Sequence, residues 1–236
     1  MSQVKYEQIG VAMTCRSYEE YIRMFALNSS AVSTGPILDV AAGASSFVAE
    51  AYANGTEAVA VDPQYGNGFE EIIDHASREI ETSTAKLDRL KEHLDWTFYG
   101  DLTRHKAMRE ASLHRFAEDF RSGKEQGRYV AATLPQLPFA SDTFALVVSS
   151  HFLFLYHEQF DYEFHISAIR ELYRVCRPGG QIRMYPVMTL GFEPYPYMDR
   201  LLTDVRAFGG KPVIGATGLL FIPASVNYLR IDKAHE

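Results

Sequence analysis

Cysteine is scarce in this sequence, which has only Cys15 and Cys176 among its 236 residues. The two lie far apart and form neither a CxxC motif nor a Cys/His cluster, so the spacing gives no sign of a disulfide framework or a zinc site. No triplet of other side chains has metal-ligand spacing, and we predict no bound metal. Cys176 falls in a predicted apolar helix stripe, which favours a buried, unreactive thiol.

Long apolar runs are also missing. No stretch approaches the roughly 20 apolar residues that a membrane span requires. Residues 1–10 are polar and lack the apolar run of a signal peptide. We therefore expect a soluble, cytoplasmic protein with no membrane partner.

Positive charge is in deficit. Lys and Arg number 23 against 30 Asp and Glu, a formal charge of −7, which repels polyanions unless a local basic patch overrides it. The richest basic segment, residues 104–115, contains Glu110 and is followed by Glu118 and Asp119. That mixture is typical of a solvated helix face, so we expect no nucleic-acid partner.

Apolar residues are plentiful enough to build one substantial core. Hydrophobic residues make up 47% of the chain and aromatic residues 13%. No internal repeat and no Pro/Ser/Gly-rich linker divides the sequence. We expect a single domain over residues 1–236.

Short apolar runs alternate with helical patterns along most of the chain. Five of these runs predict buried strands at residues 36–41, 58–61, 129–132, 144–150 and 181–187. Two more strand-like runs, within residues 211–233, predict an antiparallel hairpin. This order predicts an α/β fold with a doubly wound seven-stranded sheet. The sheet is mostly parallel, with the antiparallel hairpin at its C-terminal edge and helices on both faces.

Helical spacing is clear in several other segments. Residues 18–26 predict a short amphipathic helix inside an N-terminal segment, residues 1–34. Further helices are predicted at residues 47–53, 158–177 and 199–208. Pro178 and the two glycines after it are expected to end the second of these.

Between the second and third strands the sequence has two helical patterns where a doubly wound unit needs one. They cover residues 68–94 and 102–120, and we interpret residues 66–125 as a helical insertion. The first carries a narrow apolar seam: Ile73, Ala76, Ile80, Ser83, Leu87, Leu90 and Leu94. The seam is expected to pack on the sheet or on the partner helix. The alternative is a lid or the surface of a homodimer.

The segments that follow the first two strands favour a nucleoside-like ligand. Ligands of such sheets bind beyond the carboxyl ends of the strands. Residues 39–47 are mostly small and lead into a helix near Ser46 that would present free N–H groups. Asp62 lies about 20 residues further on, where an acidic side chain can accept both ribose hydroxyls. The alternative for Asp62 is a simple turn residue before Pro63.

Three motifs in this order resemble those of class I S-adenosylmethionine (SAM)-dependent methyltransferases. Residues 39–45 resemble the family's first motif, an acidic residue followed by alternating glycines. Residues 134–149 resemble its "LPF…D-x-F-D-x-V" passage, and residues 171–180 its "E-x-x-R-V-L-K-P-G-G" element. The resemblance covers nearly the whole chain and implies SAM as cofactor and S-adenosylhomocysteine as product.

The resemblance also assigns cofactor contacts to eight residues: Asp39, Ala41, Gly43, Asp62, Pro63, Thr133, Leu134 and Ser149. Asp39 and the backbone of the next two would hold the methionine moiety. Asp62 would bind the ribose, Pro63, Thr133 and Leu134 would contact the adenine, and the Ser149 carbonyl would face the SAM amino group. N-terminal segments often form the lid in this family, so residues 1–34 are expected to cover the cofactor through Tyr18 and Tyr21.

The sequence departs from the family pattern at four places. Ala41 and Ser45 replace glycines, which is tolerable if both residues keep φ below zero. Thr133 replaces a common acidic residue and would bind an amino group without charge assistance. Ala145 replaces a frequent Asp.

Candidates for a general base follow the fourth and fifth strands, and His151 lies where this fold usually lines the acceptor pocket. The alternative is a hydrogen-bonded histidine at a helix start. His93, His105 and His114, on the inserted helices, are expected to be exposed. Aromatic residues near this edge would suit a small organic acceptor, although some of them could be ordinary core: Phe152, Phe154, Tyr156, Tyr185, Phe192, Tyr195 and Tyr197.

The leading prediction is an enzyme that transfers a methyl group from SAM to an O or N nucleophile on a small organic molecule. One alternative is an NAD-dependent oxidoreductase, although residues 39–47 lack G-x-G-x-x-G. Another is a non-catalytic protein that binds SAM or forms a dimer through the apolar seam.

Overall fold

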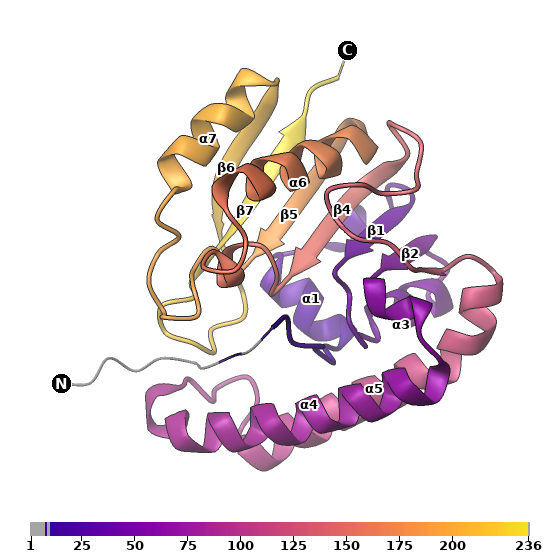
Figure 1. The fold of residues 1–236 in the computed structure, drawn as a ribbon, viewed down its shortest axis with the longest axis vertical. Helices are drawn as coiled ribbons and strands as arrows, with labels where there is room; N and C mark the ends of the chain where they lie inside the picture. The colour runs from indigo at the N-terminus through magenta and orange to yellow at the C-terminus, as the bar shows by residue number, and fades with distance from the viewer. Residues whose placement is uncertain (1–7, 9, 236) are drawn as a thin grey trace.

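The structure, a computed structural model, describes residue 8 and residues 10–235. Its seven-stranded sheet has helices on both faces (Figure 1) and the strand order β3-β2-β1-β4-β5-β7-β6. The strands are β1 (Ile37–Val40), β2 (Ala58–Val61), β3 (Tyr129–Val130), β4 (Phe144–Ser150), β5 (Cys176–Tyr185), β6 (Gly210–Ala216) and β7 (Asn227–Lys233). β7 runs antiparallel to β5 and β6, and the other pairs are parallel, which confirms the predicted fold class.

Seven α-helices surround the sheet in the described part of the chain. They are α1 (Tyr18–Met24), α2 (Ser29–Ser33), α3 (Phe47–Ala53), α4 (Phe69–Leu90), α5 (Leu102–Glu125), α6 (Tyr162–Val175) and α7 (Met198–Ala207). Polar side chains cap several of them: Ser17 accepts a hydrogen bond from the Glu20 N–H at the start of α1, and Asp101 and Asp161 act likewise at α5 and α6. Such caps satisfy N–H groups that the first turn of a helix leaves free.

Alternate residues of the central strands enter different layers of the core. Ile37, Ala60 and Leu146 pack with α1, α3 and α5, whereas Leu38 and Val147 pack with α6 and α7. This follows from the period of two residues in a strand. Because both faces are covered, the central strands are buried almost throughout, as their continuous apolar sequence predicts.

The strand order reverses between β1 and β4, which lie side by side in the middle of the sheet. β1 leads outward to β2, and β4 leads outward to β5 on the other side. Segments that leave the carboxyl ends of these two strands diverge, and a crevice for a ligand opens between them.

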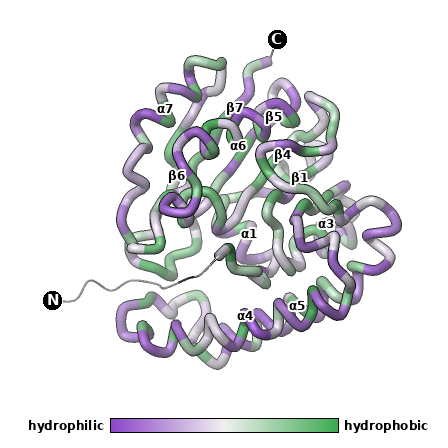
Figure 2. The backbone as a smooth tube through the Cα atoms, viewed as in Figure 1, coloured by the Kyte–Doolittle hydropathy of each residue, from purple (hydrophilic) through white to green (hydrophobic). Residues whose placement is uncertain are grey.

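Helices α4 and α5 lie between β2 and β3 in the sequence and pack against each other below the sheet (Figure 1). On α4, Ile72, Ala76, Ile80 and Leu87 are buried, and Figure 2 shows hydrophobic positions interrupting largely hydrophilic helices. Three residues of the predicted seam are thus buried, and Ile72 is buried where Ile73 was predicted; Ile73 itself is partly buried against the core. Across the described residues, no helix combines the length and apolar character that a membrane span needs.

The structure corrects the boundaries around Pro178. α6 ends at Val175, and β5 already begins at Cys176, so Cys176 lies in a strand and not in a helix stripe. Its thiol is buried all the same, and burial raises its pKa to about 12. The proline and its glycines belong to the irregular first part of β5, where the register to β4 shifts. The predicted helix stop therefore came two residues late, since the backbone becomes extended before the proline.

Candidate active site

The loop after β1 is built around Gly43. Its φ of 58° lies in the left-handed region that favours glycine. The Gly43 N–H donates to Asp62 Oδ2 at 3.0 Å, and its carbonyl accepts from the Tyr65 hydroxyl at 2.7 Å. Asp62 Oδ1 accepts from the Gln64 N–H at 2.9 Å. Asp62 thus joins the loops after β1 and β2.

Ala41 also has a positive φ, 56°, so the expectation that it keeps φ below zero is wrong. A residue with a Cβ occupies a conformation that costs it about 1 kcal/mol or more. The hydrogen bond from the Ala42 N–H to the Val61 carbonyl holds the loop in this turn. Ser45 is not among the residues with a positive φ, as predicted.

Residues 11–16 lie across this loop and occupy its N–H groups. The Ala44 N–H donates to the Thr14 carbonyl and the Ser46 N–H to the Arg16 carbonyl, both at 3.0 Å. The Phe47 N–H donates to Ser45 Oγ at 3.1 Å. The N–H groups that were predicted to be free near the start of α3 are therefore in part occupied, that of Ser46 by the N-terminal segment and that of Phe47 by Ser45.

A cavity of about 300 Å³ lies beside the loop; we call it the Asp62 cavity. Five of the eight predicted cofactor residues line it together: Ala41, Asp62, Pro63, Thr133 and Leu134. Its other walls come from residues 11–13, from His75 on α4, and from three aromatic rings, Phe152, Phe160 and Phe164. The sequence thus identified one side of the cavity and missed His75, whose helix was expected to pack on the sheet or the partner helix, or to form a lid or a dimer surface.

The other three predicted cofactor residues do not line this cavity. Asp39 and Ser149 are buried at the ends of neighbouring strands, and Gly43 lies beneath Thr14. Ser149 Oγ has no hydrogen-bond partner among the described residues, and no hydrogen bond of good geometry reaches Asp39, although the Tyr21 hydroxyl lies close enough to lower the pKa of its carboxyl. Buried polar atoms without partners are rare and call for an explanation such as a bound ligand.

The two aspartates differ in their surroundings. Burial holds the pKa of the Asp39 carboxyl well above its usual range, and the nearby charge of Asp62 acts in the same direction. Burial also raises the pKa of Asp62, but the backbone N–H groups of Gln64 and Gly43 oppose this. Asp62 is thereby the better stabilised carboxylate of the two.

A second cavity, of about 130 Å³, lies on the other side of residues 12–13; we call it the His151 cavity. Its lining is mainly apolar and comes from the seam of α4, from residues 185–192 after β5 and from residues 219–222. Tyr156, Tyr185 and Phe192 line it as predicted. Tyr195 does not; it is buried and hydrogen-bonded to His165 instead. Cys15, Arg16, His105 and Arg109 complete the lining, and we call these four residues the floor of the cavity.

His151 directly follows β4 and has a φ of 53°. Its N–H donates to the Tyr185 carbonyl at 2.6 Å, its Nδ1 lies 2.8 Å from Ser150 Oγ, and its ring packs edge-on against Tyr185. Burial lowers the pKa of His151 well below its usual range, and the charges of Arg16 and Arg109 lower it further. The imidazole is therefore neutral at neutral pH, and burial and both arginines oppose its protonation.

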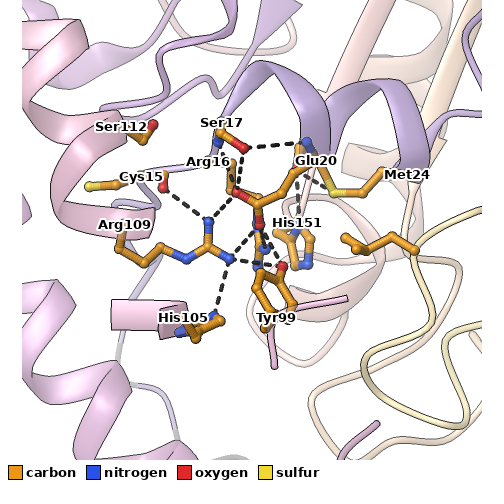
Figure 3. Close-up of polar contacts among 12 residues, drawn as sticks. Cys15, Arg16, Ser17, Glu20, Met24, Tyr99, His105, Arg109, Ser112 and His151 are labelled. Atoms are coloured by element: carbon orange, nitrogen blue, oxygen red, sulfur yellow. Dashed lines mark hydrogen bonds and ion pairs between the residues drawn. The ribbon is translucent and has the colours of Figure 1, made fainter. Parts of the chain in front are cut away.

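A buried ion-pair cluster supports this floor (Figure 3). Glu20 accepts from both terminal nitrogens of Arg109, at 2.6 and 2.5 Å, and from Arg16 at 3.0 Å. Tyr99 and His105 complete the cluster through Arg109 at 3.1 and 3.2 Å. Although burial alone would raise it, the pKa of Glu20 is held well below its usual range by Arg109 and Arg16.

Two expectations about the inserted helices are corrected here. His105 is buried, not exposed, and residues 104–115 include the buried Arg109 and Ser112, so this segment is not simply a solvated face. The signal was present: His105 and Arg109 share the helical spacing of Phe116 and Phe120. His93 and His114 are exposed, as predicted.

The predicted role of Tyr18 and Tyr21 is not observed. Both rings stack on Phe47, with centroids 5.4 and 4.4 Å apart, and neither lines a cavity described above. The segment that covers the cavities comprises residues 11–16. Residues 1–7 and 9 of the expected lid lie outside the described residues.

Comparisons with known proteins concern the family of the chain. The methyltransferase domain family matches residues 105–184, which include β4, the segment after it and most of β5. An uncharacterized protein of Methanocaldococcus jannaschii is 33% identical over 193 residues, which cover 81% of this chain and 85% of that protein. The chain belongs to the class I SAM-dependent methyltransferase family.

Two solved structures are among those similar to this chain, and the first shares its fold. An O-methyltransferase family protein from Burkholderia thailandensis aligns with a TM-score of 0.50 and 12% identity, over 92% of this chain and 56% of that one. A SAM-dependent methyltransferase from Aquifex aeolicus aligns with a TM-score of 0.45 and 13% identity, over 91% of this chain and 87% of that one.

As a class I methyltransferase, the protein is an enzyme whose cofactor is SAM. The Asp62 cavity fits a nucleoside. Each Asp62 oxygen accepts one backbone N–H and keeps a lone pair for a further donor. The cavity offers aromatic and proline faces beside it, and the buried polar atoms of Asp39 and Ser149 lie at the ends of the adjoining strands.

Proposed function

We propose that this methyltransferase acts on an O or N nucleophile of a small organic molecule bound in the His151 cavity. The observation that carries the proposal is the arrangement of the two cavities. They share Ala12 and Met13 as a wall, and the second is small, largely apolar and lined by a neutral imidazole. Such a site suits a small acceptor and not a protein or nucleic-acid surface.

Asp62 would bind the ribose hydroxyls, while Pro63, Thr133 and Leu134 would contact the adenine. Asp39, Ala41, Gly43 and Ser149 would hold the methionine end, which needs the backbone at Thr14 to shift from the loop, because the Thr14 carbonyl now covers Gly43. The Ser149 hydroxyl would gain the partner that it lacks, and the Asp39 carboxylate a partner in addition to the nearby Tyr21 hydroxyl.

SAM supplies a methyl group activated on a sulfonium. The protein orients the acceptor in line with that methyl and excludes water, and the apolar seam of α4 serves the second purpose. His151 would remove the proton of a protonated acceptor. Its Nδ1 faces Ser150 Oγ, which fixes the ring orientation.

Calorimetry with SAM, S-adenosylhomocysteine and NAD tests the cofactor part. We expect both SAM species to bind and NAD not to bind; binding of NAD alone would favour the oxidoreductase alternative. Incubation with methyl-labelled SAM and a small-molecule extract of the host cells tests transfer. Label in a low-molecular-weight product is expected. Tight SAM binding with no labelled product would support the non-catalytic alternative.

A further inference from the structure

The floor of the His151 cavity carries more positive than negative charge. Arg16 and Arg109 both line the cavity, and both pair with the same carboxylate, that of Glu20. Glu20 is fully buried, and its single negative charge is shared between two guanidinium groups. Arg109 takes both oxygens in a bidentate pair, so Arg16 is the less satisfied of the two.

Arg16 has an open donor at this floor. Its side chain is 13% exposed, and its buried Nε has no hydrogen-bond partner among the described residues. One terminal nitrogen bonds to Glu20 at 3.0 Å. An arginine presents five N–H donors in a fixed fork that matches a carboxylate, and an unmet buried donor is costly.

The other groups at and around the floor add no negative charge. Burial raises the pKa of Cys15 to about 12, so its thiol stays protonated. Burial lowers the pKa of His105 to about 2, with the charge of Arg109 as the next cause, and that of His151 falls for the same reasons. Tyr156 and Tyr185 are likewise neutral, because burial raises the pKa of both.

One acidic group does face the cavity. Glu79 lies on α4, and its side chain is partly exposed to solvent. Its charge acts inside the cavity, where it contributes to the raised pKa of Cys15 and of Tyr156. Glu79 is the one carboxylate among the described lining residues, against the two guanidinium groups of Arg16 and Arg109.

We propose that the acceptor has an apolar body and a carboxylate, and that Arg16 binds this carboxylate at the floor of the His151 cavity. The proposal rests on the proposed function of this cavity as the acceptor site. It assigns Arg16 to acceptor specificity and leaves Arg109 as the residue that positions Glu20. Apolar side chains of the α4 seam, Ile80, Leu87 and Leu90, would contact the acceptor's body.

The test compares two probes of nearly equal shape, 3-phenylpropanoate and 3-phenylpropanamide, by calorimetry on the full chain saturated with S-adenosylhomocysteine. We expect the carboxylate to bind at least about tenfold more tightly than the amide, which corresponds to about 1.4 kcal/mol. Arg16→Gln should abolish this preference, and Arg16→Lys should retain part of it. Arg23→Gln is the matched control, because Arg23 forms the equivalent i,i+4 pair with Glu19 on the exposed side of α1.

Three results would overturn the proposal: equal or tighter binding of the amide, no binding of either probe, or loss of S-adenosylhomocysteine affinity in Arg16→Gln without probes. Loss of S-adenosylhomocysteine affinity would show that the Arg16 guanidinium binds the carboxylate of the cofactor instead. Titrations of the probes into the protein without S-adenosylhomocysteine test carboxylate binding at Arg16 independently of cofactor binding. If the carboxylate preference persists while SAM does not bind, the proposed function fails, and Arg16 remains a carboxylate-binding residue of a cavity with another role.

Discussion

At the scale of single residues, Asp62 both joins two loops and lines a cavity. Its carboxylate accepts N–H groups from Gly43 and Gln64 and so holds two loops together, while the same side chain lines the Asp62 cavity. The sequence left a choice between a ribose ligand and a turn residue. The structure shows the turn role, which is compatible with a ligand role because lone pairs remain.

Asp62→Ala should weaken S-adenosylhomocysteine binding by about 1–3 kcal/mol, through loss of hydrogen bonds to a charged acceptor. Calorimetry gives the affinity, and urea unfolding gives the accompanying loss of stability. Asp101→Ala is the matched control, because it removes an aspartate cap from the exposed start of α5. It should lower stability by about 1 kcal/mol and leave the affinity intact. Unchanged affinity in Asp62→Ala would leave only the turn role.

His151→Gln should slow methyl transfer by roughly 10²–10⁴-fold if the acceptor is protonated, while cofactor affinity is retained. Initial rates at saturating SAM, together with calorimetry, make the comparison. His157→Gln is the control, because His157 lines neither of the two cavities. Full activity of His151→Gln would remove it as a base.

Position along the chain predicted Asp62, Thr133 and His151, because each directly follows a recognisable strand. The Glu20–Arg109 pair could not be predicted in this way. Its members are 89 residues apart, one at the start of the chain and one on an inserted helix. Only the three-dimensional packing of α1 against α5 brings them together, and charge in a sequence is ordinarily a sign of exposure.

At the scale of elements, the pattern of α4 predicted a helix and an apolar face, and it left the partner of that face open between the sheet, the second inserted helix, and a lid or dimer surface. A seam of period 3.6 shows which residues are buried and not what covers them. In the structure the seam is shared between α5 and the His151 cavity. The boundaries of α3, β2 and β4 were predicted correctly, because turn residues or caps punctuate them.

The docking of residues 11–16 on the loop after β1 depends on Gly43. A Cβ there would lie 2.8 Å from the Thr14 carbonyl oxygen. Gly43→Ala should therefore displace this segment, and we expect faster proteolysis within residues 10–16 and a loss of about 1–3 kcal/mol in the free energy of unfolding.

Gly55→Ala is the control for backbone strain alone. Gly55 also has a positive φ, 79°, but an added Cβ meets nothing within 4 Å. It should cost about 1 kcal/mol without any change in proteolysis of the N-terminal segment. Equal behaviour of the two variants would show that the Thr14 contact is unimportant.

At the scale of the whole molecule, buried histidines and aspartates give opposing pH dependences. Burial lowers the pKa of His105 to about 2 and that of His165 to about 4. As the pH falls below about 6.5, these histidines become protonated in the unfolded chain but stay neutral in the folded protein. The free energy of unfolding therefore decreases. Asp39 acts oppositely, because its raised pKa lets the folded state bind a proton first.

His105→Gln isolates the first effect. Between pH 7.5 and 5, the wild type should lose about 2 kcal/mol of unfolding free energy relative to this variant. Asp39→Asn should show the opposite sign, since the wild type gains stability relative to it as the pH falls. Urea unfolding at a series of pH values measures both. The same sign in both variants would contradict the assignment.

Since Ala12 and Met13 form a wall of both cavities, the two ligands meet the same short stretch of backbone. A cofactor that shifts this stretch changes the shape presented to the acceptor, and an acceptor that presses on it changes the fit of the cofactor. Thermodynamic linkage makes such an effect equal in both directions. Each ligand should therefore alter the dissociation constant of the other by the same factor, through the two-residue wall that separates the cavities.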